Sequence, residues 1–480
     1  MKKAPTWLLI GVLILIILAQ TQCALTKNDA KALRDGPFLP GAEGLAALLF
    51  GLWGIWALAT GQLRKIQLPP LAAWAFIAVA IIAVGRADSK EALKSGVVDV
   101  AQFTLYFLCL YTLLLNVLKG EDVIRKAITF IGVCTALMVL VGLVQYAVVA
   151  DPAQASETFP DVHSTFGLGE YVAGKITIGP LALGGPSSRS IYCNYLLMVL
   201  PILFALGTGL ESPKWLKPAL LATVGVGALT MLSGLHFWAL VAIVLALSLR
   251  RGTKTTVTLA AVVLVFTVAS PFAFKRNWQA NVVEVLDFYE EGVFDEAAAV
   301  DEGYEGGEDD MPTTTEVKKR WIEWQPALNM LGESPALGVG TGGYQLHIGP
   351  MYGMLPNFKK IEPDTNCGWL VIAASMGLCG FIALVALYYS RYKAATEAAE
   401  AAASPFLRAL ALGLSGGILG LIIANVFSGV LVRGLGITVI LILALATAIE
   451  RMPKADEHAD EDTTTETEAE EASETPTEGE

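Results

Sequence analysis

Long apolar runs alternate with short polar segments along most of the chain. A helix needs about 20 apolar residues to cross the hydrocarbon core of a bilayer, and twelve runs come close to that length. The runs are Trp7–Ala19, Leu45–Ala59, Leu71–Val84, Val100–Leu118, Ala127–Val149, Ile191–Leu206, Ala219–Leu232, Leu235–Leu249, Val257–Phe272, Trp369–Tyr389, Leu410–Val426 and Val430–Ala448. The pattern predicts an all-α membrane protein with about twelve transmembrane helices.

A long polar insert separates the ninth apolar run from the tenth. We therefore predict four regions: transmembrane helices 1–9 in residues 1–272, one large extracytoplasmic loop containing short helices in residues 273–365, transmembrane helices 10–12 in residues 366–450, and a disordered acidic tail in residues 451–480.

Within the insert, one segment has the periodicity of a helix. Residues 316–331 place apolar side chains three or four positions apart, at Val317, Trp321, Trp324, Leu328 and Leu331. This spacing predicts an amphipathic helix with one aromatic face.

Composition excludes a soluble multidomain protein, with 54% hydrophobic residues, 16% charged residues and a mean hydropathy of +0.56. Basic residues concentrate in alternate short loops, for example at Arg64, Arg250 and Arg391. Because cationic loops resist translocation, these loops and both termini are predicted to be cytoplasmic and the insert extracytoplasmic. The predicted location is therefore the cell inner membrane, with multiple passes.

The net charge of −12 comes from the C-terminal region, because Asp456–Glu480 contains twelve acidic residues and neither Lys nor Arg. The region also lacks the apolar residues that a folded core needs, so we predict a solvated, disordered tail.

Several classes of chemistry find no support in the sequence. The six cysteines and four histidines show neither a metal-ligand spacing nor a disulfide framework. No phosphate-binding loop, HExxH motif or GxSxG motif is present. We expect no metal site, no cofactor and no nucleic-acid partner.

Two blocks of sequence carry the clearest functional signal. The first is Arg320-Trp321-x-x-Trp324-x-x-Ala327-Leu328-x-Met330, followed by Pro335-x-Leu337-Gly338-Val339-Gly340-x-Gly342-x-Tyr344. The second is Asn366-Cys367-Gly368-Trp369-Leu370, followed by Ser375-Met376-Gly377-Leu378-Cys379-Gly380. Together they resemble the outer-loop signature and the block after it in the superfamily of O-antigen ligases and polysaccharide polymerases.

The resemblance implies a GT-C-like fold and a metal-independent glycosyltransferase. Members of the superfamily transfer a glycan from a polyprenyl diphosphate carrier, such as undecaprenyl diphosphate, to a glycan or lipid acceptor in surface polysaccharide or lipopolysaccharide biosynthesis. The matching motif implies substrate-binding roles for Trp321, Gly338, Gly340 and Tyr344.

The chain departs from the family pattern in the second block and also in the hairpin between the seventh and eighth runs, which usually reads Ser-Arg-Gly and here reads Ser233-Gly234-Leu235-His236. Asn366 and Cys367 stand where histidine and asparagine are usual, and Ser375 stands where glutamate is usual. These departures remove the histidine base of the family mechanism and leave the expected fold unchanged.

A departing diphosphate concentrates negative charge, which guanidinium groups bind well. We predict this role for Arg189 at the outer end of the sixth run, for Arg320 in the insert and for Arg433 near the outer end of the last run. Two alternatives stay open: Arg189 as an arginine that snorkels to the interface, and Arg320 as a membrane-surface anchor together with the two lysines before it.

An attacking hydroxyl also needs a group that accepts its proton. An amide is not basic, so we predict Asp364 as the base, with Asn366 orienting a sugar or phosphate oxygen. Alternatively, Asp364 caps the tenth helix. His236 stands near the missing arginine of the family hairpin, either as an intermittent positive charge or, as the sequence favours, as a hydrogen-bonded residue at a helix end.

The leading hypothesis is a transferase for lipid-linked glycans, and the pattern does not separate a ligase from a polymerase or a protein-glycosylating enzyme. A transporter or flippase would predict paired discontinuous helices and inverted repeats, and the sequence shows neither. A third hypothesis is a catalytically silent relative that binds lipid-linked glycans.

Overall fold

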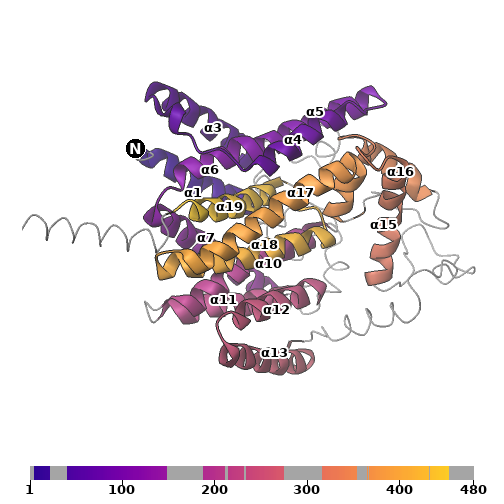
Figure 1. The fold of residues 1–480 in the computed structure, drawn as a ribbon. Coiled ribbons are helices and arrows are strands. Elements are labelled where there is room, and N and C mark those ends of the chain that lie inside the picture. The colour runs from indigo at the N-terminus through magenta and orange to yellow at the C-terminus, as the bar shows by residue number, and fades with distance from the viewer. Residues whose placement is uncertain are drawn as a thin grey trace, which may run out of the picture.

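The computed structural model describes residues 5–21, 41–148, 187–210, 215–231, 234–274, 316–353, 365, 367–431 and 433–452. Within these ranges the regular elements are helical, and no strand occurs (Figure 1). They are α1 (Thr6–Thr21), α3 (Gly41–Ala59), the 3-10 helix η1 (Gln62–Lys65), α4 (Leu71–Val84), α5 (Lys90–Thr104), the π-helix η2 (Leu105–Leu110), α6 (Tyr111–Val117), α7 (Glu121–Val148), α10 (Ser187–Gly209), α11 (Leu216–Thr230), α12 (Gly234–Leu249), α13 (Thr253–Phe274), α15 (Glu316–Glu333), α16 (Tyr344–Gly353), α17 (Gly368–Ala401), α18 (Pro405–Phe427) and α19 (Arg433–Glu450).

Six helices of the described residues are long and apolar enough to cross a membrane: Ala42–Ala59, Lys90–Val117, Glu121–Leu140, Tyr192–Gly209, Gly368–Ala401 and Pro405–Phe427. Shorter apolar helices cover Thr6–Ala19, Leu71–Val84, Leu216–Thr230, Leu235–Leu249, Thr253–Val268 and Leu435–Glu450. Each predicted apolar run therefore coincides with a helix, and the all-α membrane character is confirmed. The number of crossings stays a prediction.

The helices run back and forth between two ends of a bundle (Figure 1). At one end, which we name the insert end, α15 and α16 lie beside the N-terminal part of α17. α10 and α12 begin there and α18 finishes there, since Asn194 of α10 contacts His236 of α12 and Ser428 after α18. At the opposite end, Arg391 of α17 meets Glu450 of α19.

The contact between α10 and α18 forms the centre of the bundle. A Cβ atom on Gly420 of α18 would lie 2.2 Å from Leu197 O of α10. One on Gly417 would lie 2.6 Å from Met198 O. Small residues permit this close approach of backbones, and packing of this kind drives helix association in lipid. The glycines of α18 thereby hold α10 in the middle of the structure.

Two helices extend furthest beyond the predicted runs. The fourth run begins earlier, at Lys90, because Ser89 Oγ accepts a hydrogen bond of 3.1 Å from Ala92 N and caps the helix. The tenth run was predicted to end at Tyr389 but continues to Ala401, through alanine-rich sequence that favours helix. The predicted bounds were wrong there because residues 90–99 and 390–401 contain charged side chains and so do not belong to an apolar run.

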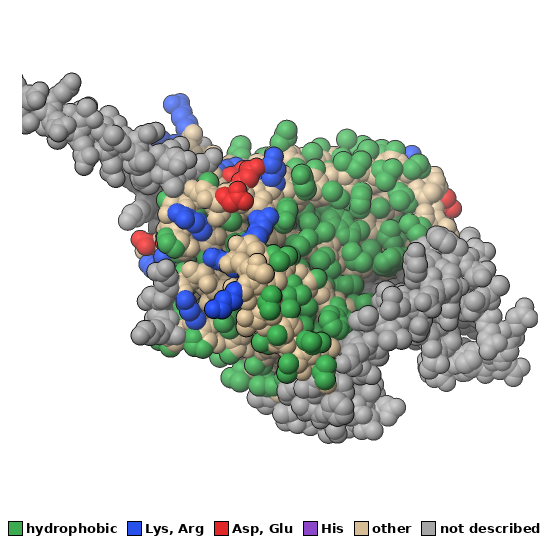
Figure 2. All heavy atoms as spheres, turned by 60° about the horizontal axis from the view of Figure 1, so that its bottom comes forward, with side chains coloured by type: hydrophobic (Ala, Val, Ile, Leu, Met, Phe, Trp, Pro, Cys, Tyr) green, Lys and Arg blue, Asp and Glu red, His purple; other side chains and the backbone are tan. Residues whose placement is uncertain are grey.

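The surface is divided into an apolar belt and a basic end. Figure 2 shows hydrophobic side chains over the wide middle of the molecule and Lys and Arg side chains gathered at one end. Among the described residues, the apolar side chains of Ile55, Leu264 and Val265 are 66, 65 and 68% exposed. Lipid covers such side chains in a membrane, so their exposure here agrees with the membrane character of the helices.

Candidate functional site

The structure places eight of the ten predicted site residues. Four have both backbone and side chain described: His236, Gly338, Gly340 and Tyr344. Four others are placed by their helix alone, in the first two turns of α10, α15 or α19: Arg189, Arg320, Trp321 and Arg433. The remaining two, Asp364 and Asn366, lie outside the described residues. The predicted roles of Arg189, Arg320 and Asp364 therefore stay predictions.

A buried chain of hydrogen bonds joins three helices at the insert end. His236 Nε2 lies 2.9 Å from Asn194 Oδ1, and Asn194 Nδ2 donates to Ser428 Oγ over 2.6 Å. Because the amide nitrogen of Asn194 faces Ser428, its oxygen is the atom that accepts from His236, so Nε2 carries the hydrogen. The side chains of His236 and Asn194 are fully buried. The interpretation of His236 as a hydrogen-bonded residue at a helix end is confirmed.

The first turn of α17 lies tightly against the last turns of α18. Trp369 Nε1 donates to Ile422 O over 2.9 Å. A Cβ on Gly368 would come within 2.3 Å of Asn425 Oδ1 and 3.1 Å of Gly429 Cα, so the absence of a side chain at this position permits a close contact. Gly368 and Trp369 of the second sequence block therefore lie against the last turns of α18, close to Ser428 of the Asn194 cluster.

The two sequence blocks also meet through Tyr344 and Thr365. Tyr344, the first residue of α16, is 3% exposed, and its hydroxyl accepts a hydrogen bond of 2.9 Å from Thr365 N. Thr365 and Cys367 are both buried. The chain on either side of position 366 is thus enclosed by protein beside α16.

The glycine-rich segment of the insert interlocks with a break in α17. The break is at Gly377, whose φ of 65° and ψ of −168° are not helical. Before the break, Ala374 O accepts from Val339 N at 2.9 Å and Ser375 O accepts from Gly340 N at 3.0 Å. Two helix carbonyls that the break would leave without partners are thereby satisfied.

After the break, the direction of donation reverses. Leu378 N donates to Pro335 O over 2.8 Å, and Cys379 N donates to Ala336 O over 3.3 Å. We name the paired segments, residues 334–343 and 374–379, the glycine joint. The two segments lie in the two sequence blocks described above. Their backbones are in direct contact, which explains why these blocks contain glycine.

The predicted face of the insert helix was partly wrong. The helix itself is confirmed as α15 (Glu316–Glu333). However, Leu328 is 39% exposed, whereas Ala327 and Met330 are fully buried and pack with Tyr344 of α16. The joint holds α15 against α16 and α17, so tertiary contacts rather than the aromatic spacing decide which side is buried.

The break in α17 bears on the transporter hypothesis. The sequence showed no paired discontinuous helices, and the break in α17 does not by itself make such a pair. Transporters use the free ends of paired broken helices to bind substrate. In α17 the backbone groups on both sides of Gly377 are bound to the chain's own loop, so this break offers no such binding site.

Sequence reasoning missed a buried carboxylate. Glu43 lies in the first turn of α3 and is 3% exposed, and Tyr106 of η2 donates a short hydrogen bond to its Oε1. Gln102 Nε2 donates in turn to the Tyr106 hydroxyl over 3.3 Å. A single acid just before the apolar run Leu45–Ala59 was the available signal, because an acidic residue carried by a membrane helix faces protein rather than lipid.

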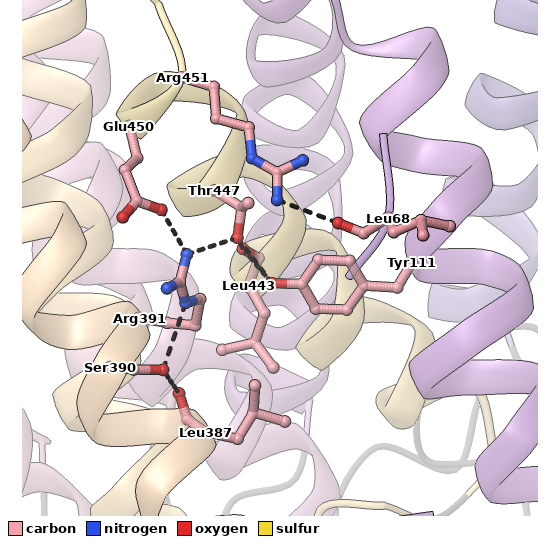
Figure 3. A network of polar contacts seen from close by, with 9 residues as sticks. All are labelled: Leu68, Tyr111, Leu387, Ser390, Arg391, Leu443, Thr447, Glu450 and Arg451. Atoms are coloured by element: carbon pink, nitrogen blue, oxygen red, sulfur yellow. Dashed lines mark hydrogen bonds and ion pairs between the residues drawn. The ribbon is translucent and has the colours of Figure 1, made fainter. Parts of the chain in front are cut away.

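A second polar network closes the opposite end of the bundle (Figure 3). Arg391 of α17 donates to Glu450 and, over 3.0 Å, to Thr447 Oγ1, both on α19. Thr447 Oγ1 lies 2.7 Å from the hydroxyl of Tyr111 in α6. We name this network the arginine latch. Arg391 was predicted to be a loop cation, which was wrong, because it is a helical residue that is only 8% exposed.

Among the residues that the structure describes, no group of three His, Cys, Asp or Glu side chains is arranged to hold a metal ion. No protein-family model matches the chain, and no curated protein matches it.

Proposed function

We propose that the chain is a membrane glycosyltransferase of the ligase-like type, which transfers a glycan from a polyprenyl diphosphate carrier to a glycan or lipid acceptor. The insert end faces the outside of the cell inner membrane in this proposal. The opposite, basic end faces the cytoplasm, as the distribution of Lys and Arg in short loops favours.

One observation carries the proposal: the two motif blocks, which are separate in sequence, interlock at the insert end. The first block supplies Val339 and Gly340, and the second supplies their acceptors on Ala374 and Ser375. If the resemblance were a coincidence of sequence, the two motif blocks would not need to be in contact. Their contact at one end of an apolar helical bundle supports an outer site of the ligase type.

The proposed reaction uses residues at or next to this end. The acceptor hydroxyl attacks the anomeric carbon of the donor sugar, the bond from that carbon to the phosphate oxygen breaks, and Asp364 accepts the hydroxyl proton. The carrier leaves as a diphosphate, with its charge stabilised by the guanidinium groups of Arg189 and Arg320. Asn366 orients an oxygen of the sugar or phosphate.

A catalytically silent glycan-binding protein is the second candidate. Asn366, Cys367 and Ser375 replace polar residues that the family usually has. A protein without the base would retain the helical bundle and the joint, and would bind lipid-linked glycan without transferring it.

Deletion of the gene separates these functions. Mass analysis of the lipid-linked sugars and gels of surface glycan would be compared between the deletion strain and its parent. Accumulated long chains on the carrier indicate a lost ligase, and accumulated single repeat units indicate a lost polymerase. Unchanged carrier-linked sugar and unchanged surface glycan would refute the transferase proposal.

Single variants then test the predicted residues. We expect Arg320→Ala and Asp364→Ala to abolish glycan transfer while the protein still inserts in the membrane at the wild-type level. Matched controls are Lys319→Ala, which removes a neighbouring cation, and Glu362→Ala, which removes a neighbouring carboxylate. Normal surface glycan with Arg320→Ala or Asp364→Ala would remove that residue from the mechanism.

A further inference from the structure

A glycine-rich loop next to arginines suggests a phosphate-binding loop, which binds anions through free backbone amides. Four amides of this loop are already engaged. Gly338 N donates to Ser334 O over 2.9 Å, and Gly343 N donates to Gly340 O over 3.0 Å. Together with Val339 N and Gly340 N, which donate to α17, four amides of the segment have partners within the protein.

The glycines of the joint leave room for backbone and not for a ligand. A Cβ on Gly338 would lie 2.3 Å from Ala374 O, and one on Gly377 would lie 2.2 Å from Ala336 O. Both residues have positive φ, at 64° and 65°. Only glycine satisfies the conformation and the spacing together.

The same loop is held on its other side by α4 and α5. A Cβ on Gly342 would come within 2.0 Å of Gly96 N in α5. Thr341 Oγ1 donates to Ala80 O of α4 over 3.0 Å. The loop is therefore enclosed between α17 on one side and the α4–α5 pair on the other.

Opening the joint would carry a large cost. It would leave two carbonyls and two amides of α17 without partners, together with the loop groups that bind them. Burying such groups without partners is strongly unfavourable, and more so where lipid replaces water. A loop that opened during each reaction cycle would incur this cost each time.

We infer that the glycine joint is a permanently closed anchor, which fixes α15 and α16 to the membrane bundle and does not itself bind the donor phosphates. The loop glycines, including Gly338 and Gly340, then serve to position the insert, and anion binding falls to arginine side chains. The part of this inference that concerns donor phosphates rests on the proposed glycosyltransferase function; closure of the joint does not.

Hydrogen exchange tests closure without any assay of function. In the full-length protein in nanodiscs, the amides of Val339, Gly340, Leu378 and Cys379 are expected to exchange as slowly as those of the central helix α10. Exchange within seconds at these four amides, while α10 stays protected, would show a joint that opens and would overturn the inference.

A native cysteine allows the joint to be locked reversibly. Cys379 is free and exposed, and its amide bonds to Ala336 O, so Ala336→Cys places a second thiol beside it. A mild oxidant would convert the two thiols to a disulfide, and mass spectrometry would identify the crosslinked protein. Ala336→Ser and the double variant Ala336→Cys/Cys379→Ala control for the substitution and for the oxidant.

We expect the crosslinked protein to transfer glycan at the same rate as its reduced form, within twofold. A loss of transfer of tenfold or more that reductant restores, and that neither control shows, would mean that the loop must open and would overturn the inference. Absence of transfer in the wild type and in every variant would refute the proposed function alone, since hydrogen exchange still decides whether the joint is closed.

Discussion

The glycine joint and the arginine latch fix the same helix, α17, near its two ends by different means. At the insert end, backbone groups of two segments bind each other directly, and four hydrogen bonds connect residues 335–340 to residues 374–379. At the opposite end, the contacts of Arg391 with Thr447 and Glu450 are made by side chains, and one partner, Glu450, is 40% exposed.

The difference predicts how each end responds to change. A backbone joint depends on the absence of side chains, so even one methyl group disrupts it, and salt has no direct effect on it. A side-chain latch depends on charge and donor geometry, so a conservative substitution retains part of its stabilisation. The comparison also indicates that the insert end tolerates less sequence variation in this protein than the basic end.

The largest effect is expected from Gly377→Ala. The backbone conformation at this position is essentially restricted to glycine, and the new methyl group would collide with the Ala336 carbonyl. Strain and overpacking together cost about 3 kcal/mol. Titration with SDS in mixed micelles would measure the loss of unfolding free energy. A change below about 0.5 kcal/mol, the range of neutral surface substitutions, would contradict the geometry of the joint.

Arg391→Ala is expected to have the next largest effect. It removes a buried guanidinium and leaves Thr447 with one partner fewer, while the half-exposed Glu450 is resolvated by water. A loss of about 2 kcal/mol follows from the strength of charge-assisted hydrogen bonds. Arg391→Lys keeps the charge and should lose about half as much. Equal losses in both variants would show that the latch depends on the shape of arginine alone.

Thr447→Val tests how much a single hydroxyl group contributes to the arginine latch. Thr447 Oγ1 connects Tyr111 and Arg391 and also donates to Leu443 O one turn earlier. We expect a loss of about 1 kcal/mol, typical of one net hydrogen bond. Thr223→Val is the matched control, because the hydroxyl of Thr223 donates to Ala219 O within its own helix. A similar loss in that control would remove the interhelical explanation.

The smallest effect is expected from Gly332→Ala, and its sign is opposite. Gly332 is an exposed residue of α15, and among the described residues a methyl group added to it would meet no heavy atom within 4 Å outside its own helix. Alanine is the better helix former, so stability should rise by about 0.5 kcal/mol. Thermal unfolding in detergent, with Gly377→Ala beside it, would show whether position or residue type decides the outcome. A loss comparable to that of Gly377→Ala would mean that glycine is needed throughout the insert.

The helices could be predicted from the sequence because the bilayer imposes a length on apolar runs. The run Trp369–Tyr389, for example, is long enough to cross and is part of α17. The buried role of Asn194 could also be expected, because polar side chains in lipid seek partners on other helices. The identity of those partners, His236 and Ser428, depends on packing that one sequence does not contain.

The joint and the latch could not be predicted, for opposite reasons. Gly377 lies within a continuous apolar run, so hydropathy gives no sign of a broken helix there. Arg391 follows such a run, so its charge suggested a loop although alanine-rich sequence continues the helix. For the candidate site, the sequence predicted only which motif residues to consider. The contact between segments distant in sequence explains why glycines occur in that motif.

The close contact between α18 and α10, which the glycines of α18 permit, can form only late in synthesis of the chain. The ribosome completes α18 roughly 200 residues after α10, which corresponds to about 10–40 s of synthesis at ordinary rates. During this interval α10 resides in the membrane with its asparagine and without its final neighbour. Until α18 is made, the surface of α10 that it covers in the folded protein is therefore open to lipid or to other helices.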